Sequence, residues 1–403
     1  MNPGLAYTDK RGRIFFDSSD EPLGDGGIVR RVMRKELVRA PAGTVPVTLP
    51  ARTPLILKGK SRRRTALAAL LPAGYTRLLL PGYEEREGAP QLPLFGYAFA
   101  CVIDDELYVA AMRTDEDANW RPRSFAEGEL ETIVATRLAR DPQNRILAQL
   151  GRCSLEYGCF TAQNVFLEQG EGALPVSPTC NARCVGCISE LDAGSAIVSP
   201  QERIRIEPDA DALTRIAVRH LERVADGIVS FGQGCEGEPL LRSTAIARTI
   251  ERIRSLRKNG TVNLNTNGSL PRSLRTLIEA GLDAVRISLN SFRPAVYAAY
   301  YRPVGYDLES VLESVALAVR AGLRVSLNLL THPGVTDDAA EVAACTAFLR
   351  EIRVALVQTR TLNIDPHVYF SQVGRPLEPI GMRSALAAIR RSGTLLGNFT
   401  HTH

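Results

Sequence analysis

The periodicity of hydrophobic and polar positions along the chain changes near residue 174. From there, short apolar runs typical of strands alternate with longer segments that carry apolar residues at helical spacing. A helix between successive strands favours parallel pairing with right-handed crossovers. The pattern therefore predicts an α/β fold in which six β/α units form a partial TIM barrel. The runs that we expect to be its strands are Ala173–Val176, Gly227–Phe231, Thr261–Asn265, Ala284–Leu289, Arg324–Leu330 and Val354–Thr361.

The residues before this region are organised differently. Tyr97–Ile103 and Glu106–Met112 are apolar runs on either side of a short Asp-Asp turn, which predicts a hairpin. Glu127–Arg140 has helical spacing and stops before an Asp-Pro pair. We therefore expect a mixed α+β N-terminal accessory domain over residues 1–150, a connecting segment over 151–173, the barrel core over 174–365 and a C-terminal extension over 366–403.

Composition narrows the class of protein. Hydrophobic residues make up 45% and charged residues 23% of the chain, which is typical of a soluble globular protein. No apolar run approaches the roughly 20 residues that span a bilayer, and the first residues lack the core of a signal peptide. We expect a cytoplasmic protein without a membrane partner. The net charge of +5 and the basic runs Arg30–Arg34 and Lys58–Arg64 favour a solvated face over nucleic-acid binding.

Polar clusters follow every predicted strand of the barrel. Functional groups of such barrels lie on the loops after the strands, so these clusters are expected to share one site. They comprise a cysteine loop after the first strand, then Gly232–Pro239, Asn265–Ser269, Ser288 with Asn290 and Ser291, Asn328 with Thr331 and His332, and Asn363 with Asp365.

The cysteine loop carries the most specific chemistry. Cys180, Cys184 and Cys187 form a CxxxCxxC pattern. Four thiolates saturate a [4Fe–4S] cube, so three in one loop leave one iron open to a small chelating ligand. A structural zinc site is the alternative, but it would require four closed ligands, usually as two spaced pairs.

With the Gly-Glu-Pro loop that follows the second strand, this pattern resembles the radical S-adenosylmethionine (SAM) superfamily over residues 174–365. The resemblance implies a [4Fe–4S] cluster held by the three cysteines, with SAM on its open iron. It also implies reductive cleavage of SAM to a 5′-deoxyadenosyl radical that takes hydrogen from a substrate, and a low-potential electron donor of the flavodoxin or ferredoxin type.

The resemblance also assigns SAM-binding residues. Glu236–Pro239 is similar to the Gly-Gly-Glu-Pro motif, so Gly237 and Glu238 are expected at the SAM ammonium group. The alternative for Glu238 is a helix-starting Glu-Pro pair. By the same resemblance, the strand-end residues Ser288 and Asn290 hold the ribose and carboxylate, and the weaker candidates for this shell are Asn267, Asn328 and Arg302.

Two positions depart from the family pattern. The aromatic residue that usually precedes the third cysteine is Gly186 here, so the adenine needs another stacking surface, for example from the N-terminal domain. The first glycine of the motif is Glu236, which adds a carboxylate near the cluster, where it is a candidate substrate contact.

Cys153, Cys159 and Cys235 leave three interpretations open. They can anchor an auxiliary iron–sulfur cluster with a fourth ligand from substrate, or be buried structural thiols, the interpretation that the sequence favours. In the third, Cys235 relays a hydrogen atom as a catalytic residue. Cys101 and Cys345 lie in apolar patterns and are expected in the core.

The protein class and the substrate also have alternatives. A non-catalytic iron–sulfur or zinc-binding scaffold or regulatory protein is the competing class. For the enzyme, the large extra N-terminal domain slightly favours a peptide or protein substrate over RNA or a small metabolite.

Overall fold

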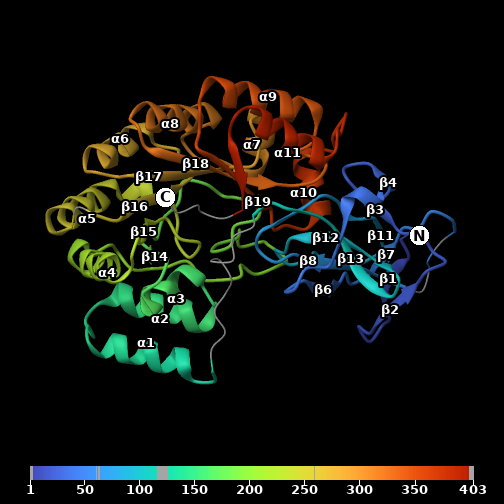
Figure 1. Cartoon of the computed structure of the whole chain (residues 1–403), viewed down its shortest axis with the longest axis horizontal. Coiled ribbons are helices and arrows are strands. Elements are labelled where there is room, and N and C mark those ends of the chain that lie inside the picture. Colours follow the sequence, from blue (N-terminus) through green and yellow to red (C-terminus); the bar gives the residue numbers. More distant parts are fainter. Residues whose placement is uncertain (1–2, 60, 62–63, 116–125, 258, 399–403) are drawn as a thin grey trace.

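The structure is a computed structural model that describes residues 3–59, 61, 64–115, 126–257 and 259–398. Its largest unit is a seven-stranded, fully parallel sheet flanked by helices (Figure 1). The strands, in spatial and sequence order, are β14 (Glu171–Leu174), β15 (Ile228–Phe231), β16 (Thr261–Thr266), β17 (Ala284–Leu289), β18 (Arg324–Thr331), β19 (Leu356–Thr361) and β20 (Leu395–Gly397). The first six confirm the predicted strands; β20 was not predicted.

Helices connect the strands as the periodicity predicts. They are α4 (Ala210–Arg223), α5 (Ser243–Leu256), α6 (Pro271–Glu279), α8 (Leu308–Arg320) and α9 (Ala339–Glu351), and α11 (Met382–Arg391) leads into β20. Two short helices, α7 (Pro294–Tyr301) after β17 and α10 (Pro366–Val373) after β19, are additions at the carboxyl ends of these strands. The result is the expected open barrel of β/α units.

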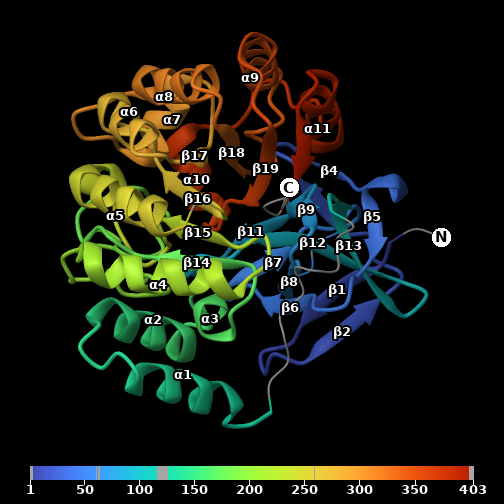
Figure 2. The same ribbon diagram turned by 60° about the vertical axis from the view of Figure 1, so that its left-hand side comes forward.

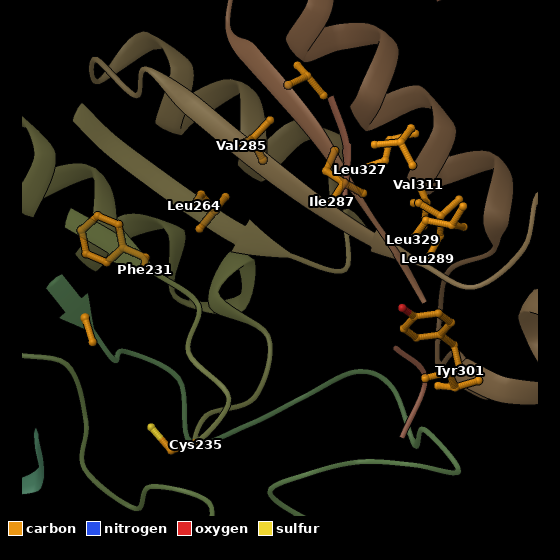
Figure 3. Packing of buried hydrophobic residues seen from close by; sticks show 14 of the residues in the cluster. Phe231, Cys235, Leu264, Val285, Ile287, Leu289, Tyr301, Val311, Leu327 and Leu329 are labelled. Atoms are coloured by element: carbon orange, nitrogen blue, oxygen red, sulfur yellow. The ribbon is translucent and has the colours of Figure 1, made fainter. Parts of the chain in front are cut away.

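The two faces of this sheet differ sharply. Val285, Ile287 and Leu289 of β17 pack with Val311 of α8 in the apolar core on the helix-covered face (Figure 3). Alternate residues point the other way, and there the sheet is polar. A parallel sheet is usually apolar on both faces, so the polar face marks the interior where a site can form. Its residues include Ser230, Asn263, Asn265, Arg286, Ser288, Ser326, Asn328, Gln358 and Arg360.

A buried ion pair crosses this interior. Both guanidinium nitrogens of Arg286 on β17 donate to the carboxylate of Glu171 on β14, at 2.8 and 2.9 Å. Their strands are three positions apart, about 14 Å along a sheet, so the two side chains meet across its polar face. The pair ties the first strand to the fourth.

The N-terminal domain is built from short antiparallel strands. Eight of them form one sheet, and β12 and β13 are the predicted hairpin, with Asp104 and Asp105 both at positive φ in the turn. The strands are β1 (Leu5–Thr8), β2 (Ile14–Asp17), β3 (Leu23–Asp25), β4 (Val29–Arg31), β5 (Leu37–Arg39), β6 (Val45–Thr48), β7 (Arg52–Pro54), β8 (Thr65–Leu70), β9 (Tyr75–Arg77), β10 (Leu80–Pro81), β11 (Tyr83–Glu85), β12 (Tyr97–Ile103) and β13 (Glu106–Arg113).

The helices after β13 belong to the barrel side, which moves the predicted domain boundary. They are α1 (Glu129–Ala139), α2 (Arg145–Glu156) and α3 (Phe160–Leu167). In Figure 2, α1, α2 and α3 lie below α4, away from the N-terminal strands. α3 packs on β14 and α2 packs on α3 and α4. The predicted boundary at residue 150 therefore falls inside α2, and among the described residues up to 113 the domain is β apart from the short helix Arg34–Glu36.

Buried polar contacts fix the N-terminal domain to the carboxyl end of β19. Arg52 forms an ion pair with Asp365 at 3.1 Å, and both side chains are 1% exposed. Arg77, also fully buried, donates to the carbonyl of Leu362 at 2.8 Å. The domain thus forms a wall of the barrel near its site. No helix in the described ranges combines the length and apolar character needed to cross a bilayer.

Candidate functional site

The cysteine loop follows β14 and is held by the end of α7. The amide of Val185 donates to the carbonyl of Tyr300 at 3.0 Å, and that of Arg183 donates to the carbonyl of Tyr301 at 3.0 Å. On the other side, Val304 donates to Asn181 at 2.9 Å. These backbone bonds give the loop one defined path, which a shaped cluster site requires.

The three cysteines of the loop, Cys180, Cys184 and Cys187, lie close enough to influence one another. All three thiols are partly exposed. Burial, together with the charges of the other two sulfurs, raises the pKa of Cys184 well above its usual value. Burial also raises the pKa of Cys180 to about 11. These thiols therefore favour their protonated form in the protein alone. A bound metal centre would make them thiolates, because its positive charge stabilises the ionised sulfur.

Cys187 has two nitrogen donors around its sulfur. The guanidinium of Arg203 and the amide of Glu190 each approach Sγ at 3.4 Å. Hydrogen bonds to cysteine sulfurs are one of the means by which proteins set the potential of iron–sulfur clusters. Arg203 also forms an ion pair with Glu190, which fixes the guanidinium beside the loop.

The loop thiols are ligands of the kind that an iron–sulfur cluster takes. Within the described residues, no three His, Cys, Asp or Glu side chains are grouped so that they could hold a single metal ion. A [4Fe–4S] cube distributes three thiolates over three separate irons. The donor set in this loop, three thiols with nitrogen donors at one sulfur, fits the cluster.

The loop after β15 lies directly against the cysteine loop. The amide of Gly237 donates to Ser177 at 2.7 Å, and that of Glu238 donates to Thr179 at 2.8 Å. These bonds hold the loop after β15 against the segment that leads from β14 into the cysteine loop. They place the Gly-Glu-Pro segment next to Cys180, as the sequence predicts.

The carboxylate of Glu238 already accepts three hydrogen bonds from the protein. Its carboxylate accepts from the amides of Leu240 at 2.9 Å and Asn267 at 2.8 Å, and from the hydroxyl of Thr266. Burial raises the pKa of Glu238 to about 7. A carboxylate has about four acceptor positions, so one remains for a SAM ammonium group, and that contact stays a prediction. The bond to Leu240 caps the short helix Pro239–Arg242, so the helix-starting alternative is also present.

Glu236 joins two loops through its carboxylate, and its expected contact with substrate stays a prediction. Its carboxylate accepts from the amides of Val176 and Ser177, both at 2.7 Å, and of Gln233 at 2.5 Å. The residue is only 5% exposed, and burial raises its pKa to about 8. These bonds use its oxygens to join the end of β14 to the loop after β15.

Asn267 supports the cysteine loop. Its side-chain amide donates to the side-chain oxygen of Asn181 at 2.9 Å, and its own oxygen accepts from Ser269. Asn181 in turn donates to the hydroxyl of Ser269 at 2.9 Å. Because both polar atoms of the Asn267 side chain are used here, the residue positions the cysteine loop, and its predicted contact with SAM remains untested.

Ser288, Asn290 and Asn328 gather at the carboxyl ends of β17 and β18. Ser288 and Asn328 are register partners on the polar face. The side-chain oxygens of Asn290 and Asn328 are buried, and neither has a hydrogen-bond partner among the described residues. Unpartnered buried acceptors are costly, and the ammonium or ribose hydroxyls of SAM would satisfy them. These residues therefore fit the predicted cofactor.

Gly186 is explained by its neighbours. A Cβ at this position would lie 3.1 Å from the hydroxyl of Tyr300 and 3.2 Å from the carbonyl of Asn363. A side chain at position 186 would crowd the hydroxyl of Tyr300, which α7 brings to the same place. Tyr300 is buried and packs edge-on against Tyr301 and Tyr369.

Three further candidates lie away from the polar face. Arg302 is on the surface, paired with Asp192 at 3.1 Å. Asp365 caps α10 and pairs with Arg52, so it joins the domains. Cys235 is 3% exposed and contacts Cys153 inside the core. Its predicted role as a hydrogen-atom relay stays a prediction.

Several residues of the site were not predicted from the sequence. Asn181 and Arg203 lie in or near the cysteine loop but carry no motif, and Tyr300 belongs to an unpredicted helix. Arg286 and Ser288 alternate with apolar residues in β17, whereas Gln358 and Arg360 belong to a polar run in β19. Polar residues inside strands of a sheet predicted to be parallel were the signal for a polar interior.

Comparisons with known proteins agree with this arrangement. The profile of the radical SAM superfamily matches residues 174–344. The GTP 3′,8-cyclase of Streptomyces coelicolor is 34% identical over 190 residues, covering 46% of this chain and 51% of the relative. The FeMo cofactor biosynthesis protein NifB of Klebsiella pneumoniae is 25% identical over 258 residues, 57% of this chain and 51% of the relative. The chain spans about half the length of the curated relatives that it matches.

Among solved structures, a radical SAM methyltransferase from Sphaerobacter thermophilus aligns with a TM-score of 0.40 at 17% identity, covering 56% of this chain and 64% of that one. The profile match begins at Leu174, the last residue of β14, and includes the cysteine loop and the Gly-Glu-Pro loop. Through residues 174–344, the chain belongs to the radical SAM superfamily.

Proposed function

We propose that this protein is a radical SAM enzyme that reductively cleaves SAM to start hydrogen abstraction from a substrate. The observation that carries the proposal is the direct pairing of the two loops, in which Gly237 and Glu238 donate to Ser177 and Thr179 beside Cys180. A non-catalytic scaffold needs the cysteines alone. It gains nothing from a second loop fixed against them or from unpartnered acceptors at Asn290 and Asn328.

The superfamily uses a [4Fe–4S] cluster and SAM, as the sequence predicts, and these cofactors supply the radical when bound. The residues of this chain have positioning roles. Cys180, Cys184 and Cys187 would hold the cluster, and the Asn181–Asn267 bond keeps their loop in place. Gly237 would offer its backbone to SAM beside the cysteine loop, and Asn290 and Asn328 would offer side-chain acceptors. An electron donor of the flavodoxin or ferredoxin type is part of the proposal.

For the substrate we favour a polar, anionic small molecule. Arg360 lies on the polar face near the carboxyl end of β19 and is exposed, and one of its guanidinium nitrogens donates to the carbonyl of Asn398 at 2.9 Å. An accessible guanidinium held in place on this face suits an anion. The relative named above as a GTP 3′,8-cyclase is a precedent for an anionic substrate, because GTP is an anion.

The peptide or protein substrate expected from the extra domain stays a prediction. That expectation treated the N-terminal domain as a docking module. The buried Arg52–Asp365 pair and the Arg77–Leu362 hydrogen bond instead attach the domain rigidly to the barrel. Such a wall favours an enclosed site for a small molecule over an open surface for a protein.

The test is release of 5′-deoxyadenosine from SAM by anaerobically reconstituted protein with dithionite. We expect about four irons per chain, a change in the cluster spectrum on adding SAM, and release of the nucleoside. Nucleoside triphosphates and short peptides, added separately, should differ in how far they stimulate it. A protein with a complete cluster that neither responds to SAM nor cleaves it would support the scaffold alternative, and zinc without iron would support the zinc alternative.

A further inference from the structure

Two buried cysteines from distant parts of the chain are in contact. Cys153 lies on α2, and Cys235 lies in the loop after β15 just before Glu236. They are 0% and 3% exposed, and their thiols are hydrogen-bonded to each other. The side-chain amide of Gln149 also donates to the sulfur of Cys153, at 3.3 Å.

The two thiols are not equivalent. The hydrogen bond from Cys235 lowers the pKa of Cys153 to about 7, and the same contact raises the pKa of Cys235. One sulfur is thus the better anion and the other keeps its proton. Such a donor–acceptor pair is an arrangement in which one thiolate can attack the partner once the partner is activated.

A third thiol gives this pair access to solvent. Cys159 precedes α3 and is partly exposed, and its backbone amide donates to the carbonyl of Cys153 at 3.0 Å. Its charge acts on Cys235. The neighbouring Thr161 bonds to Gln233 at 2.8 Å, which joins the start of α3 to the loop that carries Cys235.

We propose that Cys153 and Cys235 form a dithiol that closes reversibly to a disulfide by exchange with low-molecular-weight disulfides, and that Cys159 is its point of entry. The thiolate of Cys159 attacks the external disulfide and releases one thiol. The thiolate of Cys153, the better anion of the pair, then displaces the second external thiol from Cys159. Finally Cys235 gives its proton to the released external thiolate, attacks the sulfur of Cys153 and frees Cys159. In total, two protein thiols lose two electrons and two protons, and one external disulfide becomes two thiols.

The disulfide would act on the loop next to the cluster. Cys235 is followed by Glu236, which fastens this loop to Val176 and Ser177, and by Gly237, which lies against the cysteine loop. A sulfur–sulfur bond of about 2.05 Å is shorter than any hydrogen-bonded contact between two sulfurs. Closure therefore draws the loop toward α2, and we expect slower SAM cleavage in the oxidised form, a consequence that rests on the proposed function.

The experiment uses the reconstituted holoprotein and oxidised glutathione as the probe. After equilibration at a series of glutathione ratios, free thiols are alkylated and the peptides are mapped by mass spectrometry. We expect a linked Cys153–Cys235 pair, while iron stays at about four per chain. Cys345, buried in α9, is the matched control and should remain fully alkylated. This readout does not depend on SAM cleavage.

Variants separate the roles. Cys235→Ala should abolish the linked peptide, and Cys159→Ser should slow its formation by about tenfold or more without changing the end point. Retention of the cluster reports that each variant is folded. Two results would overturn the proposal. The first is that Cys153 and Cys235 are both alkylated at every glutathione ratio in the wild type. The second is an iron content of about eight per chain that falls to about half in Cys153→Ala, because this would assign these thiols to an auxiliary cluster.

Discussion

Gly237 lies so close to Thr179 that a Cβ on the glycine would be 2.0 Å from the carbonyl oxygen of Thr179. Real side chains do not approach a backbone oxygen to that distance, and a backbone cannot give way as a flexible side chain can. The glycine is therefore required by the contact between the two loops of the site. The hydrogen bond from the backbone amide of Gly237 to the carbonyl of Ser177, at 2.7 Å, depends on the same close approach.

Gly237→Ala should consequently separate the two loops. We expect the variant to bind less iron on reconstitution and to lose the spectral response to SAM, because the cysteine loop loses the backbone bonds that hold it. Iron content and the electronic spectrum measure this. Gly194→Ala, in the segment after the cysteines where a Cβ meets nothing within 4 Å, is the matched control and should behave as wild type. Equal iron content in both variants would contradict the argument.

Much of the barrel could be predicted because its signals are local. The strands β15 to β19 are short apolar or alternating runs, and helical spacing separates them. β20 has only three residues, Leu395–Gly397, which is too short a run to predict a strand. α7 and α10 have eight residues each, too few for a periodic pattern to stand out.

The positions of the site residues were predictable, but their partners were not. The motif places Glu236 and Glu238 correctly, yet their carboxylates are satisfied by amides from other strands, which no local pattern reveals. Gly186 shows the same limit. The lack of a side chain there is explained by Tyr300, which approaches from a helix more than a hundred residues later.

Cys184→Ala should abolish the cluster. Three thiolates hold the cube, and the central position of Cys184 between the other two sulfurs leaves no substitute ligand in the loop. We expect iron content to fall far below four per chain and 5′-deoxyadenosine release to disappear. Cys345→Ala, which removes a buried thiol from α9, should keep iron and activity. A Cys184→Ala protein that retained the full cluster spectrum would rule out this ligand assignment.

Arg286→Met should destabilise the fold. It leaves the carboxylate of Glu171 buried without its bidentate partner, and breaking such a pair costs about 3–5 kcal/mol. Urea denaturation of the holoprotein measures the change. The double variant Glu171→Met with Arg286→Met removes both charges and should be more stable than the sum of the single losses predicts. Strictly additive losses would show that the two side chains do not interact.

Asn328→Leu should weaken SAM binding without destabilising the chain. The side-chain oxygen of Asn328 is buried and has no partner among the described residues, so its removal from the apoprotein breaks no bond to it. Loss of one hydrogen bond to SAM corresponds to about a two- to tenfold higher Kd. Ser326→Ala, two residues earlier on the same face of β18, is the control and should leave the Kd unchanged. An unaltered Kd in Asn328→Leu would place SAM elsewhere.

The buried carboxyl of Glu236 gives the fold a pH dependence of defined sign. Burial raises its pKa to about 8 from an ordinary 4.5, against the opposing effect of three amide donors. Between these values the folded chain holds a proton that the unfolded chain releases, so this group's contribution to the free energy of unfolding is largest at low pH and is lost as the pH rises toward 8. Glu236→Gln should remove that part of the slope. Urea denaturation of both proteins between about pH 5.5 and 7.5 measures it, and identical slopes would show that Glu236 is ionised in the folded protein throughout.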